Sequence, residues 1–235
     1  MDVTREAELA AALDRLRTRL AAACESAQRD PADVTLLPVT KFFPASDVEI
    51  LYRLGCRAFG ESREQEASAK VAALHTREPV AWHMIGRLQR NKSRAVAKWA
   101  HTVHSVDSPR LAAALDRAAG EVRDAPLRVL LQVSLDADTE RGGVAANDLA
   151  ALADQVDDSP NLQLSGVMAI PPLDADPDRA FARLAELHDD LRRAHPHATE
   201  LSAGMSNDLE IAVRHGSTCV RVGTALMGPR PLISH

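Results

Sequence analysis

The pattern of hydrophobic and polar positions repeats along most of the chain. It opens with one helical stretch, in which Leu9, Leu13, Leu16 and Leu20 recur at three- and four-residue spacing. After Pro31 the chain alternates short apolar runs with polar or glycine-containing turns and then with helical stretches. This alternation predicts a long N-terminal helix followed by repeated strand-then-helix units.

Eight apolar runs are candidates for strands; they cover residues 34–41, 56–61, 80–86, 101–106, 127–135, 162–170, 198–205 and 219–227. Helical stretches between them include residues 46–54, 63–74, 109–119, 147–156, 178–193 and 206–213. Crossovers long enough for a helix imply parallel strands. We therefore predict the α/β class: a single (β/α)8 barrel of the TIM type over residues 1–235, with an extra N-terminal helix. A doubly wound open sheet is the alternative. Pro38 conflicts with the first strand, because proline cannot donate to the ladder.

Composition and charge narrow the class of protein. The chain has 235 residues, of which 46% are hydrophobic, enough for a substantial core. Its net charge of −5 makes a cationic surface for nucleic acid or anionic lipid unexpected. No apolar run reaches the length of a membrane span, and the N-terminus lacks the pattern of a signal peptide. The three cysteines fit neither a disulfide framework nor a zinc pattern, so we expect a cytoplasmic protein.

Lys41 is the first candidate for chemistry. In a (β/α)8 barrel the reacting groups come from the carboxyl ends of the strands. Of the four lysines, Lys41 alone lies at such an end. Partial burial there would lower the pKa of the amine and free it for Schiff-base formation. The alternative is a lysine paired with a carboxylate at the barrel mouth.

The loops after the seventh and eighth strands are candidates for an anion site. Ser206 is expected near the start of a helix, where its hydroxyl and free backbone N–H groups could receive an anion. Gly223 and Thr224 would allow close backbone approach at the end of the eighth strand, and barrels often hold phosphate with these two loops. Alternatively, Ser206 is only a helix cap and Gly223 a turn. Together with Lys41, the loops suggest a phosphorylated carbonyl compound.

Arg221 and several histidines complete the candidates. Arg221 shares the inward side of its strand with Gly223, and a buried arginine needs a partner, either a ligand nitrogen or a barrel carboxylate. His101 and His104 should face opposite sides of their strand and make a poor metal pair. Two further histidines, at 195 and 197, flank a proline in a loop and suggest no role.

Six ordered motifs carry a family resemblance: Pro38–Lys41, Phe59–Glu61, His83–Lys92, Gly166–Ile170, Gly204–Asp208 and Arg221–Thr224. In these motifs the chain resembles the YggS/PROSC-type pyridoxal phosphate homeostasis proteins over nearly its whole length. The resemblance implies a barrel like the N-terminal domain of alanine racemase. It also implies pyridoxal 5'-phosphate (PLP) as cofactor, held as an internal aldimine on Lys41.

The same resemblance implies further cofactor contacts. Ser206, Gly223 and Thr224 would hold the phosphate, and Arg221 would face the pyridine nitrogen. Met168 and His83 would line the pocket. Ser62 is a departure, because the family usually has Asn at this position. A hydrogen bond made by that amide must be lost, shortened or replaced by the hydroxyl.

Three functions are compatible with these residues. The first is a non-catalytic protein that stores, buffers or delivers PLP, possible recipients being apo PLP-dependent enzymes. The second is a PLP-dependent amino-acid racemase. An arginine on the ring nitrogen weakens the electron sink. Racemases of this type also take a second base, a tyrosine, from another domain. We expect no such domain here, and the only tyrosine, Tyr52, lies in a predicted helix. The third is a Schiff-base lyase for a phosphorylated sugar. We favour the first, as a monomer or weak dimer.

Overall fold

The computed structural model describes residues 3–136, 142–172 and 174–230. Its eight strands are all parallel and form one sheet in the order β1-β8-β7-β6-β5-β4-β3-β2. The strands are β1 Thr35–Pro38, β2 Ala58–Glu61, β3 Ala81–Met84, β4 Thr102–Val106, β5 Leu127–Gln132, β6 Leu162–Met168, β7 Glu200–Ser202 and β8 Cys219–Val222.

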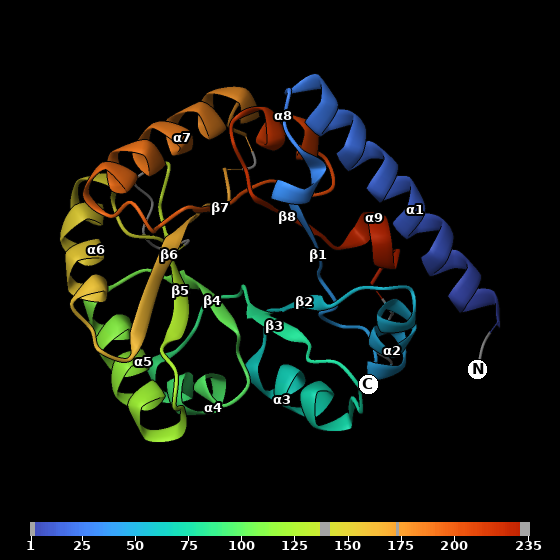
Figure 1. The fold of residues 1–235 in the computed structure, drawn as a ribbon, viewed down its shortest axis with the longest axis horizontal. Helices are drawn as coiled ribbons and strands as arrows, with labels where there is room; N and C mark the ends of the chain where they lie inside the picture. Colours follow the sequence, from blue (N-terminus) through green and yellow to red (C-terminus); the bar gives the residue numbers. More distant parts are fainter. Residues whose placement is uncertain (1–2, 137–141, 173, 231–235) are drawn as a thin grey trace.

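Helices surround this sheet on the outside (Figure 1). The α-helices are α1 Val3–Ser26, α2 Ala45–Arg53, α3 Glu64–Ala73, α4 Ser93–Ala97, α5 Pro109–Val122, α6 Leu149–Asp157, α7 Pro177–Ala194, α8 Leu209–Arg214 and α9 Thr224–Met227. Short 3-10 turns cover Pro31–Asp33, Arg90–Lys92 and Ala146–Asp148. The predicted order of strands and helices is confirmed.

The sheet curls into a nearly closed barrel, so the open-sheet alternative was wrong. Its two edge strands, β1 and β2, meet at a parallel bridge between Val39 and Gly60. Next to it the Thr40 amide donates to the Gly60 carbonyl at 3.0 Å. Pro38 is tolerated because it is the last residue of β1, in register with Val222, and the following amide, that of Val39, donates to the Val222 carbonyl.

Several predicted strands are shorter in the structure, and two of the shifted boundaries change the mouth of the barrel. The predicted strand 219–227 ends at Val222, because Gly223 leaves the extended conformation and residues Thr224–Met227 form α9. The predicted helix 206–213 begins only at Leu209, as α8. Ser206 therefore lies in the turn before that helix and is not its N-cap.

Helix α1 covers one side of the barrel. The four leucines of the predicted apolar stripe, Leu9, Leu13, Leu16 and Leu20, are all buried. They share a cluster with residues of α2, α8 and α9, such as Leu226. Burial of this stripe stabilises α1 far more than the intrinsic helix propensity of its residues does.

Two negative findings concern the described part of the chain. No helix there is both long and apolar enough to cross a membrane. The three cysteines are free thiols, with Cys24 and Cys219 buried and Cys56 half-buried.

A bulge in β6 depends on Gly166. The register between β5 and β6 shifts by one residue where Gly166 comes opposite Leu130. Gly166 has a φ of +151°, and a Cβ placed there would lie 1.8 Å from the Glu200 carbonyl oxygen. Because the obstacle is the backbone of the neighbouring strand, it cannot move aside as a side chain would.

We therefore expect Gly166→Ala to lower the free energy of unfolding by more than about 3 kcal/mol, measured by urea denaturation. Gly228→Ala is the matched control. Gly228 also has a positive φ, of 82°, but nothing lies within 4 Å of its added Cβ. That change should cost only about 1 kcal/mol. Equal losses in the two variants would contradict the steric explanation.

Candidate functional site

Lys41 lies at the carboxyl end of β1, half-buried at the barrel mouth. Among the described residues no hydrogen bond or ion pair holds its amine; the nearest aromatic contact is the Phe42 ring, 5.8 Å away. Burial lowers the pKa of Lys41, and the positive charge of Arg230 lowers it further. The amine therefore loses its proton more readily than that of a solvated lysine.

The carboxylate that could have paired with Lys41 is taken by another lysine. Lys70, which is 5% exposed, donates to Glu61 at 2.8 Å, to Glu66 at 2.8 Å and to the Thr40 carbonyl at 2.7 Å. The Thr40 hydroxyl donates to the same Glu61 oxygen at 2.6 Å. Charge pairing therefore takes place below the mouth and leaves the Lys41 amine available.

The same network fixes the turn that presents Lys41. The Phe42 amide donates to Glu66 at 2.5 Å, and Phe42 has a positive φ of 71°. Lys70 binds the carbonyl of Thr40, on the other side of Lys41. Because the backbone is held both before and after the lysine, its Cα is fixed while its side chain stays unpaired.

Arg221 points into the barrel from β8 and is 4% exposed. It donates to the Ser202 hydroxyl at 2.6 Å and to the Ala169 carbonyl at 2.9 Å. The described residues give it no ion pair with a carboxylate, so the barrel-carboxylate alternative was wrong. Burial lowers the pKa of Arg221, which stays a permanent cation.

A chain of hydrogen bonds runs from Arg221 through the barrel interior. His104 contacts Ser202 through Nδ1 at 3.0 Å and His83 through Nε2 at 2.8 Å. Since Arg221 can only donate, Ser202 accepts from it and has its own proton free for His104 Nδ1. His104 then carries its proton on Nε2 and donates to His83 Nδ1. The chain fixes both tautomers and holds Arg221 in place.

Burial keeps both histidines of this hydrogen-bonded series, His83 and His104, neutral. We therefore expect the stability of the protein to depend on pH. Burial lowers the pKa of His83 to about 3 and that of His104 well below its ordinary value. The unfolded chain takes up these protons near pH 6.5, so it binds more protons than the folded chain below that pH. Stability should fall as the pH drops from about 6.5 towards about 3, by up to about 2 kcal/mol per histidine at pH 5.

Urea denaturation at pH 7.5 and pH 5 measures this loss. The control is His75→Asn, which removes an exposed histidine and should leave the loss unchanged. Equal stability of the wild type at the two pH values would contradict the account.

The loops after β7 and β8 meet at the mouth. The Ala225 amide of α9 lies 3.4 Å from the Ser206 hydroxyl, to which it donates. Ser206 thus caps α9 and not α8, which brings it beside Gly223 and Thr224. A Cβ added to Gly223 would lie 3.8 Å from the Cβ of Val39, so Gly223 is next to the end of β1. The candidate anion-binding residues therefore lie next to the carboxyl end of β1, the end at which Lys41 follows.

The remaining predicted site residues divide between the two ends of the barrel. Met168 ends β6 in register with Ser202 and is fully buried, so its side chain shares the inward side. Ser62 follows β2 at the mouth, where its backbone oxygen lies 2.3 Å from a Cβ added to Gly86. That contact requires glycine at 86. His83 lies nearer the opposite end of the barrel.

His83 lines a cavity of about 1010 Å³ at the amino ends of the strands. Its wall includes Thr35, Ala58, Ala81 and Thr102, which begin β1, β2, β3 and β4. Lys41 lies at the opposite end of the barrel. The position of His83 therefore favours an indirect role, in which it supports Arg221 through His104 and Ser202, over direct contact with a ligand at Lys41.

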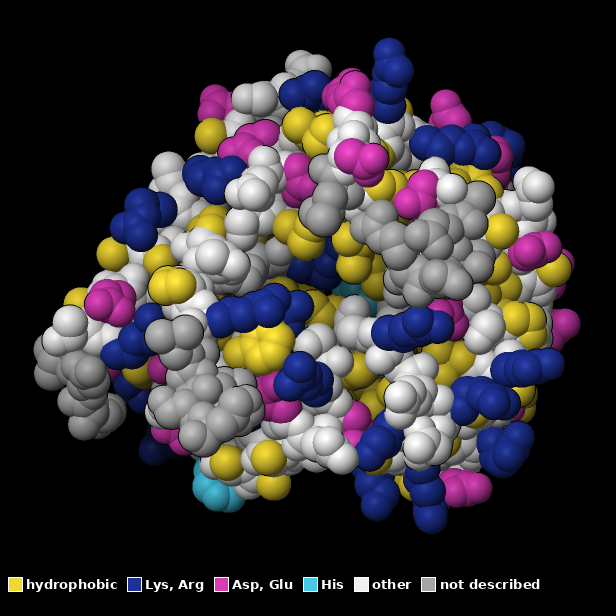
Figure 2. Space-filling model, turned by 180° about the vertical axis from the view of Figure 1, so that it is seen from behind, with side chains coloured by type: hydrophobic (Ala, Val, Ile, Leu, Met, Phe, Trp, Pro, Cys, Tyr) yellow, Lys and Arg dark blue, Asp and Glu magenta, His cyan; other side chains and the backbone are white. Residues whose placement is uncertain are grey.

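The mouth itself is hollowed on the face that Figure 2 shows. Lys and Arg side chains lie at its rim and in its depth, with hydrophobic side chains between them. Phe42 accounts for part of this arrangement, since the guanidinium groups of Arg63 and Arg230 lie 5.1 and 4.5 Å from its ring centroid. A phosphorylated, partly aromatic anion would complement such a surface.

Sequence reasoning missed Ser202, His104 and the Glu61–Lys70 pair. The expectation that His101 and His104 face opposite sides of one strand does not apply as stated, because His101 lies just before β4 and its ring is 5.7 Å from that of His83, the partner of His104. The period-two position of His104 could have placed it in the barrel, but its partners come from β3 and β7. No local signal identifies contacts that only the closed sheet creates.

Comparison with known proteins identifies the family. The alanine racemase N-terminal domain family matches residues 12–231. The pyridoxal phosphate homeostasis protein of Mycobacterium tuberculosis strain H37Rv is 58% identical, covering 98% of this chain and 96% of that protein. The pyridoxal phosphate homeostasis protein of Escherichia coli K12 is 37% identical, covering 95% and 97%.

Solved structures agree. PipY of Synechococcus elongatus PCC7942, with PLP bound, has a TM-score of 0.82 at 38% identity, over 94% of this chain and 100% of that chain. An unknown protein from Bifidobacterium adolescentis has a TM-score of 0.90 at 31% identity, over 96% and 97%. Alanine racemase from Corynebacterium glutamicum, at 15% identity and a TM-score of 0.69, over 95% of this chain and 63% of that one, shares the fold. The chain is a member of the pyridoxal phosphate homeostasis protein family, built on the alanine racemase N-terminal domain fold.

Proposed function

We propose that this protein stores PLP and delivers it to other proteins, holding it reversibly as an internal aldimine on Lys41. The observation that carries the proposal is the half-buried Lys41 amine, which has no hydrogen bond or ion pair among the described residues. The PLP-bound state of PipY, a relative of nearly the same extent, supports the choice of cofactor.

The residues at the mouth fit the three parts of PLP. The Lys41 nitrogen would bond to the aldehyde carbon, and the carbonyl oxygen would leave as water; the lowered pKa of Lys41 favours the unprotonated amine that this needs. Ser206, Gly223 and Thr224 would receive the phosphate. Arg221 would face the pyridine nitrogen. Met168 and Ser62 would line the sides.

Arg221 also favours binding over catalysis. A guanidinium has no acceptor and does not give up its proton, so it would keep the ring nitrogen unprotonated and the ring a poor electron sink. Its bonds to Ser202 and Ala169 hold it in place. Storage needs only the reversible bond to Lys41, which this environment does not oppose.

The position of Tyr52 weighs against the racemase alternative. Its hydroxyl accepts from the Glu78 amide at 3.0 Å, and its ring stacks on Arg57, whose guanidinium lies 4.2 Å from the ring centroid. Both contacts lie near the end of α2, away from Lys41. Tyr52 is therefore poorly placed to serve as a second base at the mouth.

Transfer of cofactor tests the proposal. Loaded protein, freed of unbound PLP, should restore the activity of an apo PLP-dependent enzyme within minutes, even with a phosphatase present to destroy free PLP. Failure to transfer over several hours would contradict a delivery role. A parallel assay in D2O should detect no exchange of amino-acid α-protons above background. Exchange that is lost in Lys41→Ala would favour the racemase.

Two features of this role follow from the sequence and remain part of the proposal. Free thiols at all three cysteines suit a reducing compartment, so we place the protein in the cytoplasm. A mouth that other proteins can reach suits a monomer or weak dimer that meets apo enzymes directly, without nucleic-acid partners.

A further inference from the structure

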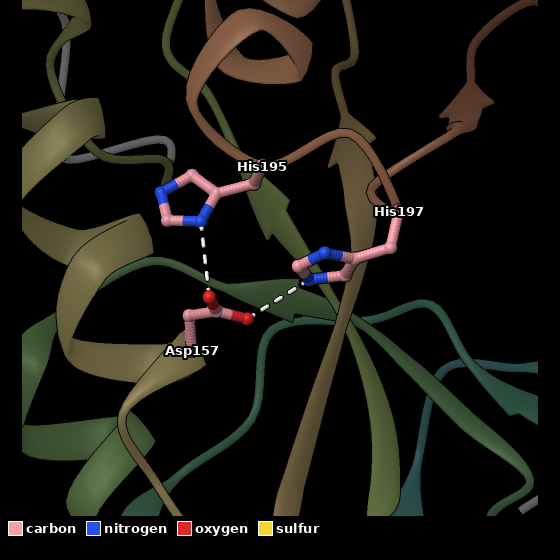
Figure 3. A group of neighbouring side chains, drawn as sticks. All are labelled: Asp157, His195 and His197. Carbon is pink, nitrogen blue, oxygen red and sulfur yellow. Dashed lines mark hydrogen bonds and ion pairs between the residues drawn. The ribbon is translucent and has the colours of Figure 1, made fainter.

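Three side chains outside the candidate PLP site converge where α6 ends and α7 leads into β7. Asp157 is the last residue of α6, His195 directly follows α7, and His197 lies in the turn to β7. In Figure 3 the carboxylate lies between the two imidazole rings. One oxygen is 3.2 Å from His195 Nδ1, and the other is 2.9 Å from His197 Nε2. One possible ligand atom from each residue lies within 4.8 Å of the others.

A second carboxylate orients the buried member of this group. Asp154 lies one turn before Asp157 on α6, and its Oδ1 is 3.0 Å from His195 Nε2. His195 is therefore held at both ring nitrogens. Histidines that bind metals usually donate their other ring N–H to a carboxylate or carbonyl, which sets the ring and its tautomer. Asp154 occupies the position of such an outer partner.

Charge and access also suit a cation. Neither Asp154 nor Asp157 forms an ion pair with a lysine or arginine among the described residues. The side chains of Asp157 and His197 are 38% and 50% exposed, whereas that of His195 is 9% exposed. An ion bound here would therefore have one buried ligand, His195, two more exposed ligands, and one side open to water.

We propose that Asp157, His195 and His197 bind a divalent transition-metal ion, specifically Zn²⁺, with Asp154 as the outer partner of His195. Two imidazoles and a carboxylate favour Zn²⁺ and its neighbours over Mg²⁺ or Ca²⁺, which prefer oxygen ligands. Tetrahedral coordination at about 2.0–2.2 Å separates neighbouring ligand atoms by about 3.3–3.5 Å. One ligand atom from each of the three residues already lies within 4.8 Å of the others, so side-chain rotations of about an ångström would bring them to this spacing.

The site would join the end of α6 to the turn before β7. In this fold the helices run back to the amino ends of the strands, so the metal site is at the end of the barrel opposite Lys41. An ion bound only by the folded chain raises stability by mass action. We therefore expect Zn²⁺ to stabilise the protein whether or not PLP is bound.

Cobalt and zinc titrations test the site on full-length, tag-free protein, first stripped of metal by a chelator. Co²⁺ should bind with one equivalent per chain and give the visible bands of a tetrahedral complex, and Zn²⁺ should displace it. His197→Ala should weaken binding at least about 100-fold, and Asp154→Asn about 10- to 100-fold. His215→Ala is the control. Like His197, His215 makes one contact with an aspartate, in this case Asp178 at 3.0 Å, but it lies outside the proposed site, so this variant should bind metal as the wild type does.

Thermal unfolding supplies a second readout. Zn²⁺ should raise the Tm of the wild type and of His215→Ala but not that of His197→Ala, which loses only a half-exposed side chain and should fold. The proposal is overturned if the wild type shows no saturable binding. It is also overturned if His197→Ala binds Co²⁺ or Zn²⁺ as tightly as the wild type.

Discussion

Replacing Lys41 by alanine is expected to abolish the covalent attachment of PLP and to weaken binding of the cofactor at least about 100-fold. The Lys41 amine has no hydrogen bond or ion pair among the described residues, so its removal should not disturb the fold. The phosphate and the ring would keep only noncovalent contacts, each worth about 1–3 kcal/mol. Titration with PLP, followed by the visible absorbance of the bound cofactor, measures both effects.

Lys98→Ala is the matched control for this prediction. Lys98 is an exposed lysine at the end of α4, outside the candidate site. The control should keep both the absorbance and the affinity. Unchanged absorbance in Lys41→Ala would mean that another group holds the cofactor, and the site would then have to be moved.

Among the substitutions considered, and apart from Gly166→Ala, replacing Lys70 by methionine is expected to cause the largest loss of stability. Lys70 and Glu61 are 5% and 0% exposed, and the second carboxylate oxygen of Glu61 has no hydrogen-bond partner within the described structure. Removing the cation leaves Glu61 buried and uncompensated, which costs about 3–5 kcal/mol in comparable pairs. Because burial raises the pKa of Glu61 even in the intact pair, Glu61 is expected to become neutral in the variant.

The double variant Glu61→Gln/Lys70→Met separates charge from packing. It removes the stranded carboxylate at nearly constant volume, so it should recover at least about 2 kcal/mol of the free energy of unfolding lost in Lys70→Met. Urea denaturation of the wild type, both single variants and the double variant completes the cycle. A loss below about 1 kcal/mol in Lys70→Met would show that the pair contributes little. PLP binding in the same variants would report whether the turn around Lys41 depends on this pair.

The fold could be predicted from the sequence because its signals are local. The spacing of Leu9, Leu13, Leu16 and Leu20 places them on one helix face, and these residues are buried as predicted. The alternation of apolar runs with helical stretches predicted the succession of strands and helices along the chain. The predicted strand that ran past Gly223 and the predicted helix that began at Ser206 were wrong. Ser206 caps α9 instead, and this contact depends on two loops that are separated in the sequence.

The candidate site was predictable only where residues lie at strand ends. Lys41, Met168 and Arg221 occupy the expected ends or inward positions. Their partners do not follow from position alone. The Arg221–Ser202 bond joins residues 19 apart, and the His104–Ser202 bond joins residues 98 apart. Of the two alternatives for Arg221, the barrel carboxylate was wrong, since the barrel offers a hydroxyl and a carbonyl instead.

The cluster formed by His195 and His197 with Asp157 could not be predicted from the sequence either. In the sequence the two histidines are only residues flanking a proline. Their common partner, Asp157, is 38 residues from His195 and comes from the preceding helix. Only the folded chain brings the end of α6 to the turn that follows α7, where these three residues form the proposed metal site.

Reduction of the PLP-loaded protein with borohydride, followed by peptide mapping, tests the central claim most directly. Borohydride converts a Schiff base into a stable secondary amine, which marks the lysine that carried it. We predict a yellow protein whose absorbance shifts on reduction and whose phosphopyridoxyl group maps to Lys41. A colourless protein that stays unmodified after incubation with excess PLP, or a label on Lys70, Lys92 or Lys98 instead, would contradict the account.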